Sequence, residues 1–310
     1  MSTFNGASYI REQLDSILAQ TYQDIELVCV DDVSTDSTFA ILTEYQILYP
    51  EKVRIFQNSK NVGSRKTFER GVLLAAGRYI AFSDQDDFWL PGKLRVLFDE
   101  IQKDQNLAFV YSNSELVDEN LKTLKARTWE ETASLFTGNS FYGVLNDNTI
   151  MGCSMLADAA FAKACAPFPA TGLHHDWYLA VMALGCNRPI LFVNQVLFKY
   201  RRHSKNQVNR MRKKGSTNTT RFRALRTFKE TALLDTRKLT NQSFRDLIIF
   251  KREMFRSILN HRPLEAFKNW KDLYSLLDTV HAVNSKVKWS NFRYIIYGLF
   301  WRKPSEQELA

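Results

Sequence analysis

The chain has few of the residues that organise small secreted, fibrous or disordered proteins. Its 310 residues include only four cysteines, seven prolines and twelve glycines. The cysteines are widely spaced and form no C-x-x-C pair, which argues against a disulfide scaffold or a cysteine zinc site and fits a reducing compartment. With 45% hydrophobic and 24% charged residues, the chain can bury a sizeable core, and global disorder and collagen-like repeats are excluded.

A long apolar run is also lacking. No stretch approaches the roughly 18 consecutive apolar residues of a membrane-spanning helix. The first residues do not show the basic and then apolar pattern of a secretory signal peptide. These absences predict a cytoplasmic protein. The length exceeds a usual domain of about 100–200 residues, so we expect one large domain with an additional region.

Charge is divided unequally along the chain. Residues 1–198 contain 16 Lys and Arg against 24 Asp and Glu, whereas residues 199–310 contain 26 against 9. A basic C-terminal third suggests a polyanionic partner such as a membrane surface or a lipid-linked phosphate, and a solvated basic helical surface would give the same pattern. It contains no nucleic-acid-recognition motif, so we expect no nucleic-acid partner.

Short apolar strands alternate with amphipathic helices in the first half. Strands are predicted at residues 25–30, 53–56, 79–82 and 107–111. The alternation predicts an α/β domain with a mainly parallel sheet covered by helices. Ligands bind at the carboxyl ends of strands in such sheets, and two acidic clusters lie there, Asp31-Asp32 and Asp84–Asp87.

The second acidic cluster carries the strongest chemical signal. Three carboxylates in four residues repel one another, so their presence at a strand end favours a bound cation. Hard oxygen ligands suit Mg²⁺ or Mn²⁺, which would neutralise a substrate diphosphate. An acidic surface turn is the alternative, but the cluster lies between an apolar strand and Phe88-Trp89, which favours the metal site.

Several short motifs then form a recognisable series. In order, they are Thr3-Phe4-Asn5-Gly6, Gln20-Thr21-Tyr22, Val30–Asp36, Asn61-Val62-Gly63 and Asp84-Gln85-Asp86-Asp87. Over roughly residues 2–210 their order and spacing resemble family 2 glycosyltransferases. The DQDDFW variant, with His175-Asp176-Trp177 and Tyr200–His203 downstream, is similar to the rhamnosyltransferase-like branch that builds bacterial surface polysaccharides.

The resemblance implies a GT-A fold and an inverting transfer of a sugar from a nucleoside-diphosphate donor, with Mg²⁺ or Mn²⁺ as cofactor. It names rhamnose as a candidate sugar, and a growing surface polysaccharide or a polyprenyl-linked glycan as the acceptor. A catalytically inactive nucleotide-sugar-binding protein of the same fold is the alternative. The intact Asp84, Asp86 and Asp176 argue against that alternative.

It also implies roles for particular residues. Asp176 matches the general base, although taken alone it would be interpreted as a helix N-cap. Asp84 and Asp86 match the D-x-D pair, with Asp86 as the direct metal ligand and Asp84 nearer the ribose. His203 completes the metal shell or touches the diphosphate.

The remaining implied residues bind the nucleotide sugar. They are Ser2 and Phe4 at the base pocket, Asp32 reading the base N–H, Arg65 or Lys66 on the base or diphosphate, Asp84, and Cys153 near the sugar. The sequence suggests no base partner for the Cys153 thiol, so we interpret it as packing and not as a nucleophile.

The two charge regions give a domain division. We expect a GT-A domain at residues 1–210 and a basic helical region at residues 211–310. The aromatic, cation-flanked stretch Asn291–Lys303 is typical of a helix in a membrane interface, with a docked core helix as the alternative. The protein would then lie at the inner face of the cell membrane.

Two positions depart from the family pattern. Met1 lies almost at the end of the expected first strand, so we expect the natural chain to start upstream. An absent inner strand would leave ladder groups unpaired, at roughly 1–3 kcal/mol per buried group. Val33 replaces a common glycine, and since a β-branched residue disfavours positive φ, we expect this turn to differ from the usual one.

Overall fold

A computed structural model describes the chain over residues 1–128, 150–169, 173–204 and 236–242, with 148, 206, 245–246, 248–249 and 252–253. The Asn291–Lys303 stretch and nearly all of residues 211–310 lie outside the described residues. The division at residue 210 and the interfacial helix therefore stay predictions. Within the described part, no helix is long and apolar enough to cross a membrane.

The N-terminal part forms a three-stranded parallel sheet. Its strands, in the order β1-β2-β3, are β1 (Ser2–Thr3), β2 (Leu27–Asp31) and β3 (Val53–Gln57). Around it lie α1 (Ile10–Leu18), α2 (Thr38–Leu48) and α3 (Ser64–Leu74). All five residues of β2 are buried, which explains its uninterrupted apolar run before Asp31.

The second sheet has six strands and mixed direction. They are β4 (Tyr79–Ala81), β5 (Phe88–Trp89), β6 (Phe109–Val117), β7 (Thr123–Lys125), β8 (Met155–Asp158) and β9 (Ile190–Arg201). The order is β4-β8-β6-β9-β5, with β7 on β6. Strand β8 runs antiparallel to both β4 and β6, whereas β6 and β9 are parallel.

The predicted α/β architecture is confirmed, but the mainly parallel sheet is found only in the N-terminal part. The difference arises because β8 comes from a segment 38 residues beyond the end of β6 and inserts between β4 and β6 in the opposite direction. Local periodicity carries no information about such a distant insertion, because it records burial and not strand partners.

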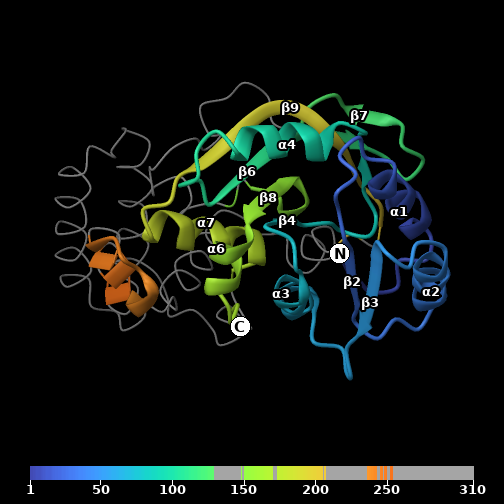
Figure 1. The fold of residues 1–310 in the computed structure, drawn as a ribbon, viewed down its shortest axis with the longest axis horizontal. Helices are drawn as coiled ribbons and strands as arrows, with labels where there is room; N and C mark the ends of the chain where they lie inside the picture. Colours follow the sequence, from blue (N-terminus) through green and yellow to red (C-terminus); the bar gives the residue numbers. More distant parts are fainter. Residues whose placement is uncertain are drawn as a thin grey trace, which may run out of the picture.

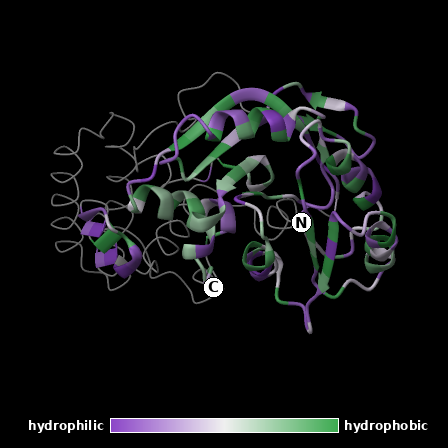
Figure 2. Cartoon of the chain, in the orientation of Figure 1, coloured by the Kyte–Doolittle hydropathy of each residue, from purple (hydrophilic) through white to green (hydrophobic). Residues whose placement is uncertain are grey.

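Helices cover the mixed sheet (Figure 1). Helix α4 (Lys93–Ile101) lies against β6, β8 and β9. Helices α6 (Ala159–Ala164) and α7 (His175–Gly185) pack near β8 and β9, and short 3₁₀ turns occupy Gly152–Ser154 and Thr236–Lys238. In Figure 2 α4 alternates apolar and polar colours, as expected of an amphipathic helix, while α7, almost entirely buried, is mostly apolar.

Candidate active site

The first strand and the second acidic cluster meet at the carboxyl ends of β2 and β4. The Gln85 amide bridges them: its Oε1 accepts the Phe4 N–H at 2.8 Å and its Nε2 donates to the Phe4 carbonyl at 3.0 Å. The Ser2 N–H also donates to the Ser83 carbonyl at 3.4 Å. Ser2 and Phe4, both predicted to line the donor pocket, therefore lie beside the Asp84–Asp87 cluster.

Asp32 is almost fully engaged by the loop after β3. Its Oδ1 accepts hydrogen bonds from Asn58 Nδ2 at 2.7 Å and from the Val62 N–H at 2.9 Å. Its Oδ2 accepts one from the Gly63 N–H at 2.8 Å. Because a carboxylate has about four acceptor positions, one position on Oδ2 is left for the predicted contact with a base N–H.

The turn after β2 holds Val33 in a left-handed backbone conformation. Its φ is 63°, although a β-branched residue disfavours positive φ, and the expected difference from the usual turn stays a prediction. The Asp31 carboxylate holds the turn: its Oδ2 accepts the Ser34 N–H at 2.9 Å, and its Oδ1 accepts the Ser34 hydroxyl at 2.5 Å and the Thr3 hydroxyl at 3.0 Å. These bonds offset the steric cost, roughly 1–3 kcal/mol, of a non-glycine residue in this region.

Two carboxylates of the second cluster have few donors. Asp87 is fully buried, its Oδ1 accepts the Arg201 N–H at 3.2 Å, and its Oδ2 has no partner among the described residues. Burial, and then the charges of Asp86 and Asp84, raise the pKa of Asp87 well above its usual range. Burial likewise raises the pKa of Asp84 to about 7, with contributions from Asp86 and Asp176.

This arrangement fits a divalent cation. One ligand atom each from Asp84, Asp87 and Cys153 lies within 4.8 Å of the others. A cation there would pair with the unpartnered Asp87 oxygen and remove the charge repulsion that raises both pKa values. The carboxylate oxygens suit Mg²⁺ or Mn²⁺, and Asp87 is a ligand candidate that the sequence analysis did not single out.

Asp86 and His203 are in direct contact, and their predicted roles at a metal or diphosphate stay predictions. His203 Nε2 lies 2.7 Å from Asp86 Oδ2, which also accepts a bond from Asn206 Nδ2 at 3.3 Å. The Asp86 carbonyl accepts a bond from Arg201 Nε at 2.8 Å, and the buried Arg201 guanidinium lies 4.7 Å from the centre of the Tyr9 ring. Arg201 thereby fixes the backbone of the acidic cluster.

A buried lysine lies behind the acidic cluster. Lys93 is fully buried, and its Nζ donates to the Cys153 carbonyl at 2.5 Å and lies 3.7 Å from the centre of the Trp89 ring. Burial lowers the pKa of Lys93 to about 7, against the opposing effects of Cys153, Asp87 and Asp84. Sequence reasoning missed this residue because a lysine at the start of an amphipathic helix is normally exposed.

Asp176 lies in the first turn of α7, two residues after the N-cap, so the alternative of Asp176 as the N-cap is wrong. The N-cap is His174, without a side-chain cap. Asp176 Oδ2 accepts the Gly152 N–H at 3.1 Å, and its Oδ1 accepts the Trp177 N–H at 2.7 Å. The adjacent His175 packs on the Phe68 ring at 4.1 Å between centres, and burial lowers the pKa of this imidazole to about 4.

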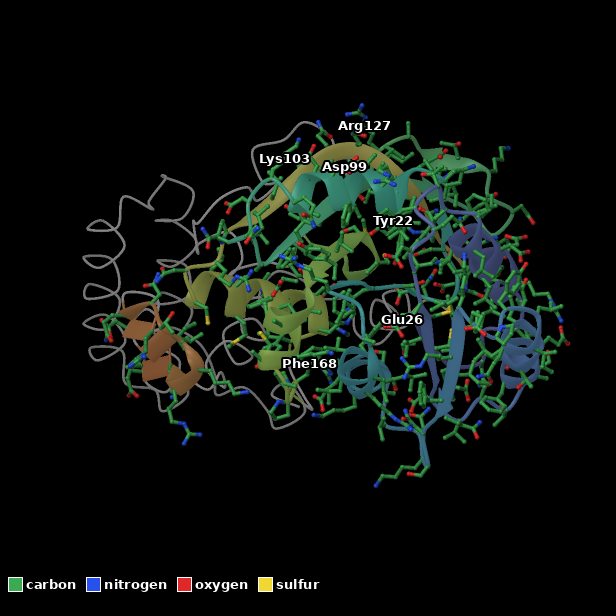
Figure 3. The ribbon with its side chains drawn as sticks, viewed as in Figure 1. Tyr22, Glu26, Asp99, Lys103, Arg127 and Phe168 are labelled. Carbon is green, nitrogen blue, oxygen red and sulfur yellow. The ribbon has the colours of Figure 1, made fainter. Side chains whose placement is uncertain are left out.

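The remaining residues predicted to bind the nucleotide sugar are Arg65, Lys66 and Cys153. Lys66 Nζ donates to Glu69 Oε2 at 2.8 Å and to the carbonyl of Phe168, labelled in Figure 3, at 2.7 Å. Its ammonium is therefore already engaged, and the preceding Arg65 stays a prediction. Burial raises the pKa of the Cys153 thiol well above its usual range, in keeping with packing and against a nucleophile.

The fold is an α/β fold of GT-A type, with a group of possible metal ligands at Asp84, Asp87 and Cys153. Residues 1–163 match glycosyl transferase family 2, and the chain belongs to this family. An uncharacterized glycosyltransferase of Nostoc sp. is 38% identical over 125 residues, which cover 40% of this chain and 38% of the relative. The dTDP-rhamnosyl transferase RfbG of Shigella flexneri is 28% identical over 219 residues, or 67% of this chain and 73% of that one.

Solved structures share the fold. TarS residues 1–349 of S. aureus, in complex with UDP-GlcNAc, matches with a TM-score of 0.60 and 16% identity, covering 96% of this chain and 87% of that one. The mannosyltransferase PcManGT of Pyrobaculum calidifontis, with GDP-Man and Mn²⁺, matches at 0.57 and 15%, covering 98% and 86%. The predicted GT-A type of fold is confirmed.

Several curated relatives are matched over only about a third of their own length, 33% to 38%.

Proposed function

We propose that the chain is an inverting, metal-dependent glycosyltransferase that moves a sugar from a nucleoside-diphosphate donor to a growing bacterial surface polysaccharide or polyprenyl-linked glycan. One observation carries the proposal. Ligand atoms of Asp84, Asp87 and Cys153 lie within 4.8 Å of one another, and the N–H of Gly152, next to Cys153, donates to Asp176 Oδ2 at 3.1 Å. This proximity supports a common site for the acidic cluster and the predicted base.

Asp176 is the residue we assign to proton transfer. An inverting displacement forms a bond from the acceptor oxygen to the anomeric carbon while the bond from that carbon to the diphosphate breaks, and the hydroxyl proton goes to the base. The Gly152 and Trp177 N–H groups donate to the Asp176 carboxylate. These two hydrogen bonds orient the Asp176 carboxylate for this step.

Asp84, Asp86, Asp87 and His203 are the residues we assign to the cation and the donor diphosphate. When bound, Mg²⁺ or Mn²⁺ neutralises the charge that develops on the leaving diphosphate. Without it, His203 and Asn206 hold the Asp86 carboxylate in place. Asp32, Ser2 and Phe4 would take the nucleoside, because they lie at the adjoining strand end.

Rhamnose is the sugar we propose, and the Shigella flexneri relative with dTDP-rhamnosyl transferase in its name supports it. Thymine and uracil present the same N–H to an acceptor such as Asp32, so the base contact admits either nucleotide.

Residues 211–310 would hold the GT-A domain at the membrane through the Asn291–Lys303 stretch. Truncation before Asn291 should then reduce co-sedimentation with anionic vesicles, and unchanged co-sedimentation would remove that role.

The first test is nucleoside-diphosphate release from a donor panel. The panel contains dTDP-rhamnose and common UDP-sugars, with Mn²⁺ or Mg²⁺ and a bacterial lipid extract as acceptor. Metal-dependent release from one donor should be lost in Asp86→Ala and kept in Asp99→Asn, a matched control at an exposed position of α4. Nucleotide binding without release from any donor by the folded chain would favour an inactive nucleotide-sugar-binding protein.

A further inference from the structure

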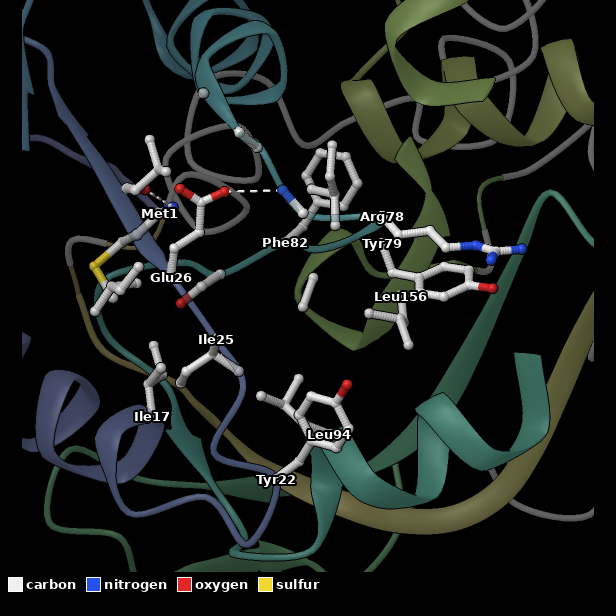
Figure 4. A pocket seen from close by; sticks show the side chains of 18 of the residues that line it. Met1, Ile17, Tyr22, Ile25, Glu26, Arg78, Tyr79, Phe82, Leu94 and Leu156 are labelled. Carbon is white, nitrogen blue, oxygen red and sulfur yellow. Dashed lines mark hydrogen bonds between the residues drawn. The ribbon is translucent and has the colours of Figure 1, made fainter. Parts of the chain in front are cut away.

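Lys93, the first residue of α4, is a cation in the interior of the protein. Its side chain is fully buried, and burying a charge is costly unless the charge is paired or hydrogen-bonded. The next residue, Leu94, lines a cavity of about 800 Å³ (Figure 4). Lys93 is instead directed at Cys153. The contacts that hold its ammonium in place therefore call for an explanation.

The ammonium has one carbonyl partner and two aromatic partners. Lys93 Nζ donates to the Cys153 carbonyl at 2.5 Å, across 60 residues of sequence. It lies 3.7 Å from the centre of the Trp89 ring and 4.5 Å from that of the Phe198 ring, and these two residues pair in the β5–β9 ladder. A hydrogen bond from an ionised donor is stronger than a neutral one, and aromatic faces attract a cation. Lys93 is thus a firmly held donor aimed at one backbone carbonyl.

That carbonyl belongs to the 3₁₀ turn Gly152–Ser154, whose three residues are all buried. Inside the turn, the Ser154 N–H and the Ser154 hydroxyl both donate to the Met151 carbonyl, at 3.0 and 2.6 Å. A 3₁₀ turn of this length has few bonds of its own and poorer hydrogen-bond geometry than an α-helix. The bond from Lys93 therefore fixes the turn from outside.

The other side of the turn lies directly against the first turn of α7. The Gly152 N–H donates to Asp176 Oδ2 at 3.1 Å. A Cβ atom at Gly152 would lie only 2.2 Å from His175 Nε2, so the backbone of the turn touches the residue before Asp176 as well. A shift of the turn would consequently move the donor that orients the Asp176 carboxylate.

We propose that Lys93 is a positioning residue for Asp176 and acts through the Gly152–Ser154 turn. The ammonium holds the Cys153 carbonyl, and the turn then presents the Gly152 N–H to the carboxylate. Lys93 needs no contact with substrate for this role. The inference deepens the proposed function and rests on it, because Asp176 is the base only if the chain is a glycosyltransferase.

A double-mutant cycle on the full chain tests the proposal. Lys93→Met removes the bond to Cys153 and fills the same space, and replacing a buried charge with a packed apolar group is often tolerated by the fold. We expect kcat for nucleoside-diphosphate release to fall roughly 10–100-fold, with the donor KM changed less than about twofold.

The second half of the cycle places the substitution in an Asp176→Asn background. There Lys93→Met should change the residual rate less than about twofold, because the residue through which Lys93 acts is already lost. Lys103→Met, at an exposed position just beyond α4, is the matched control and should leave the rate unchanged.

Amide hydrogen exchange reports on the turn without any need for activity. In Lys93→Met the Gly152 amide should exchange at least about tenfold faster, because local opening of the turn becomes easier. The Tyr178 amide, bonded to the His174 carbonyl within α7 at 2.8 Å, should not change and reports any general loosening. If Lys93→Met does not fold, Lys93→Gln takes its place in both measurements.

The outcomes are distinct. Equal losses of kcat in the two backgrounds, or unchanged Gly152 exchange, would overturn the proposal. A higher donor KM with unchanged kcat would also overturn it, and would assign Lys93 to the charge balance of the acidic cluster. If the unsubstituted chain releases no nucleoside diphosphate from any donor, the proposed function fails, and Gly152 exchange by itself decides whether Lys93 positions the Asp176 carboxylate.

Discussion

The two acidic strand ends, Asp31-Asp32 after β2 and Asp84–Asp87 after β4, are alike in sequence and opposite in environment. Around the first, backbone N–H groups and side-chain donors converge on both carboxylates. Around the second, Asp87 keeps one oxygen without a described partner, and burial raises the pKa values of Asp84 and Asp87. Hydrogen bonds within the fold satisfy Asp31 and Asp32, whereas Asp84 and Asp87 lack enough nearby positive charge to offset their own.

The difference separates two uses of a buried carboxylate. A carboxylate with several N–H donors organises backbone, as Asp31 does for the turn at Val33 and Asp32 does for the loop at Val62-Gly63. Carboxylates that repel each other destabilise the folded chain when ionised, and such a cost is retained where a ligand relieves it. The predictions below follow from this contrast, from the largest expected effect to the smallest.

Asp84→Asn should separate activity from stability most clearly. With the cluster charge reduced, nucleoside-diphosphate release should fall by about 10²–10³-fold, a magnitude typical for loss of one electrostatic contact to the transition state. The melting temperature at pH 8 in metal-free buffer should rise, because the variant removes the repulsion between Asp84 and the charges of Asp86 and Asp176. Asp99→Asn serves as the exposed control, and a fall in melting temperature with full activity would reverse the assignment.

Asp32→Ala should lower the stability of the folded protein, which is the reverse of the effect expected for Asp84→Asn. It removes hydrogen bonds to Asn58, Val62 and Gly63, so the free energy of unfolding should fall by about 3–4 kcal/mol. Urea unfolding monitored by circular dichroism measures this loss. The exposed Asp24→Ala should change little, and equal unfolding midpoints for Asp32→Ala and the unsubstituted protein would show that the loop does not depend on this carboxylate.

His175 should make stability depend on pH. Burial lowers its pKa to about 4, while the nearby Asp176 charge raises it and His174 lowers it. Between about pH 6.5 and 4 the His175 imidazole is protonated in the unfolded chain but stays neutral in the folded chain. The contribution of His175 to the free energy of unfolding therefore falls as the pH falls, by roughly 3 kcal/mol in total.

The neutral His175→Gln variant tests this sign. Its stability, measured by urea titrations at pH 7 and pH 4.5, should fall less on acidification than that of the unsubstituted protein. His174→Gln is the matched control on the neighbouring residue. The same acid loss in both variants would assign the pH dependence to other groups.

Val33→Gly gives the smallest expected effect and refines the account of the first acidic pair. Glycine adopts the φ of 63° freely, so the variant should gain about 0.5–1 kcal/mol, net of the greater entropy of its unfolded chain. Val62→Gly, in the adjoining loop and without a positive φ, should not gain. A loss in Val33→Gly would mean that the valine side chain contributes more packing than its backbone costs.

Much of the fold and part of the site were predictable from local sequence. The strands at 25–30, 53–56 and 79–82 and the helices between them are confirmed, because burial imposes apolar periodicity on the residues themselves. The strand-end position of both acidic clusters follows from the same pattern. The mixed direction of the second sheet did not follow, since β8 reaches β4 and β6 from a distant part of the chain.

The sequence by itself determined the α/β class, the family 2 motifs and which carboxylates stand at strand ends. Only the tertiary structure decided that Asp32 is nearly saturated while Asp87 is not, that Lys93 is buried behind the cluster, and that Arg201 holds its backbone. The physical reason is the separation along the chain of the residues that determine each property. Periodicity is local, whereas hydrogen-bond satisfaction and desolvation depend on neighbours more than a hundred residues away, as the bond between the Arg201 N–H and Asp87 shows.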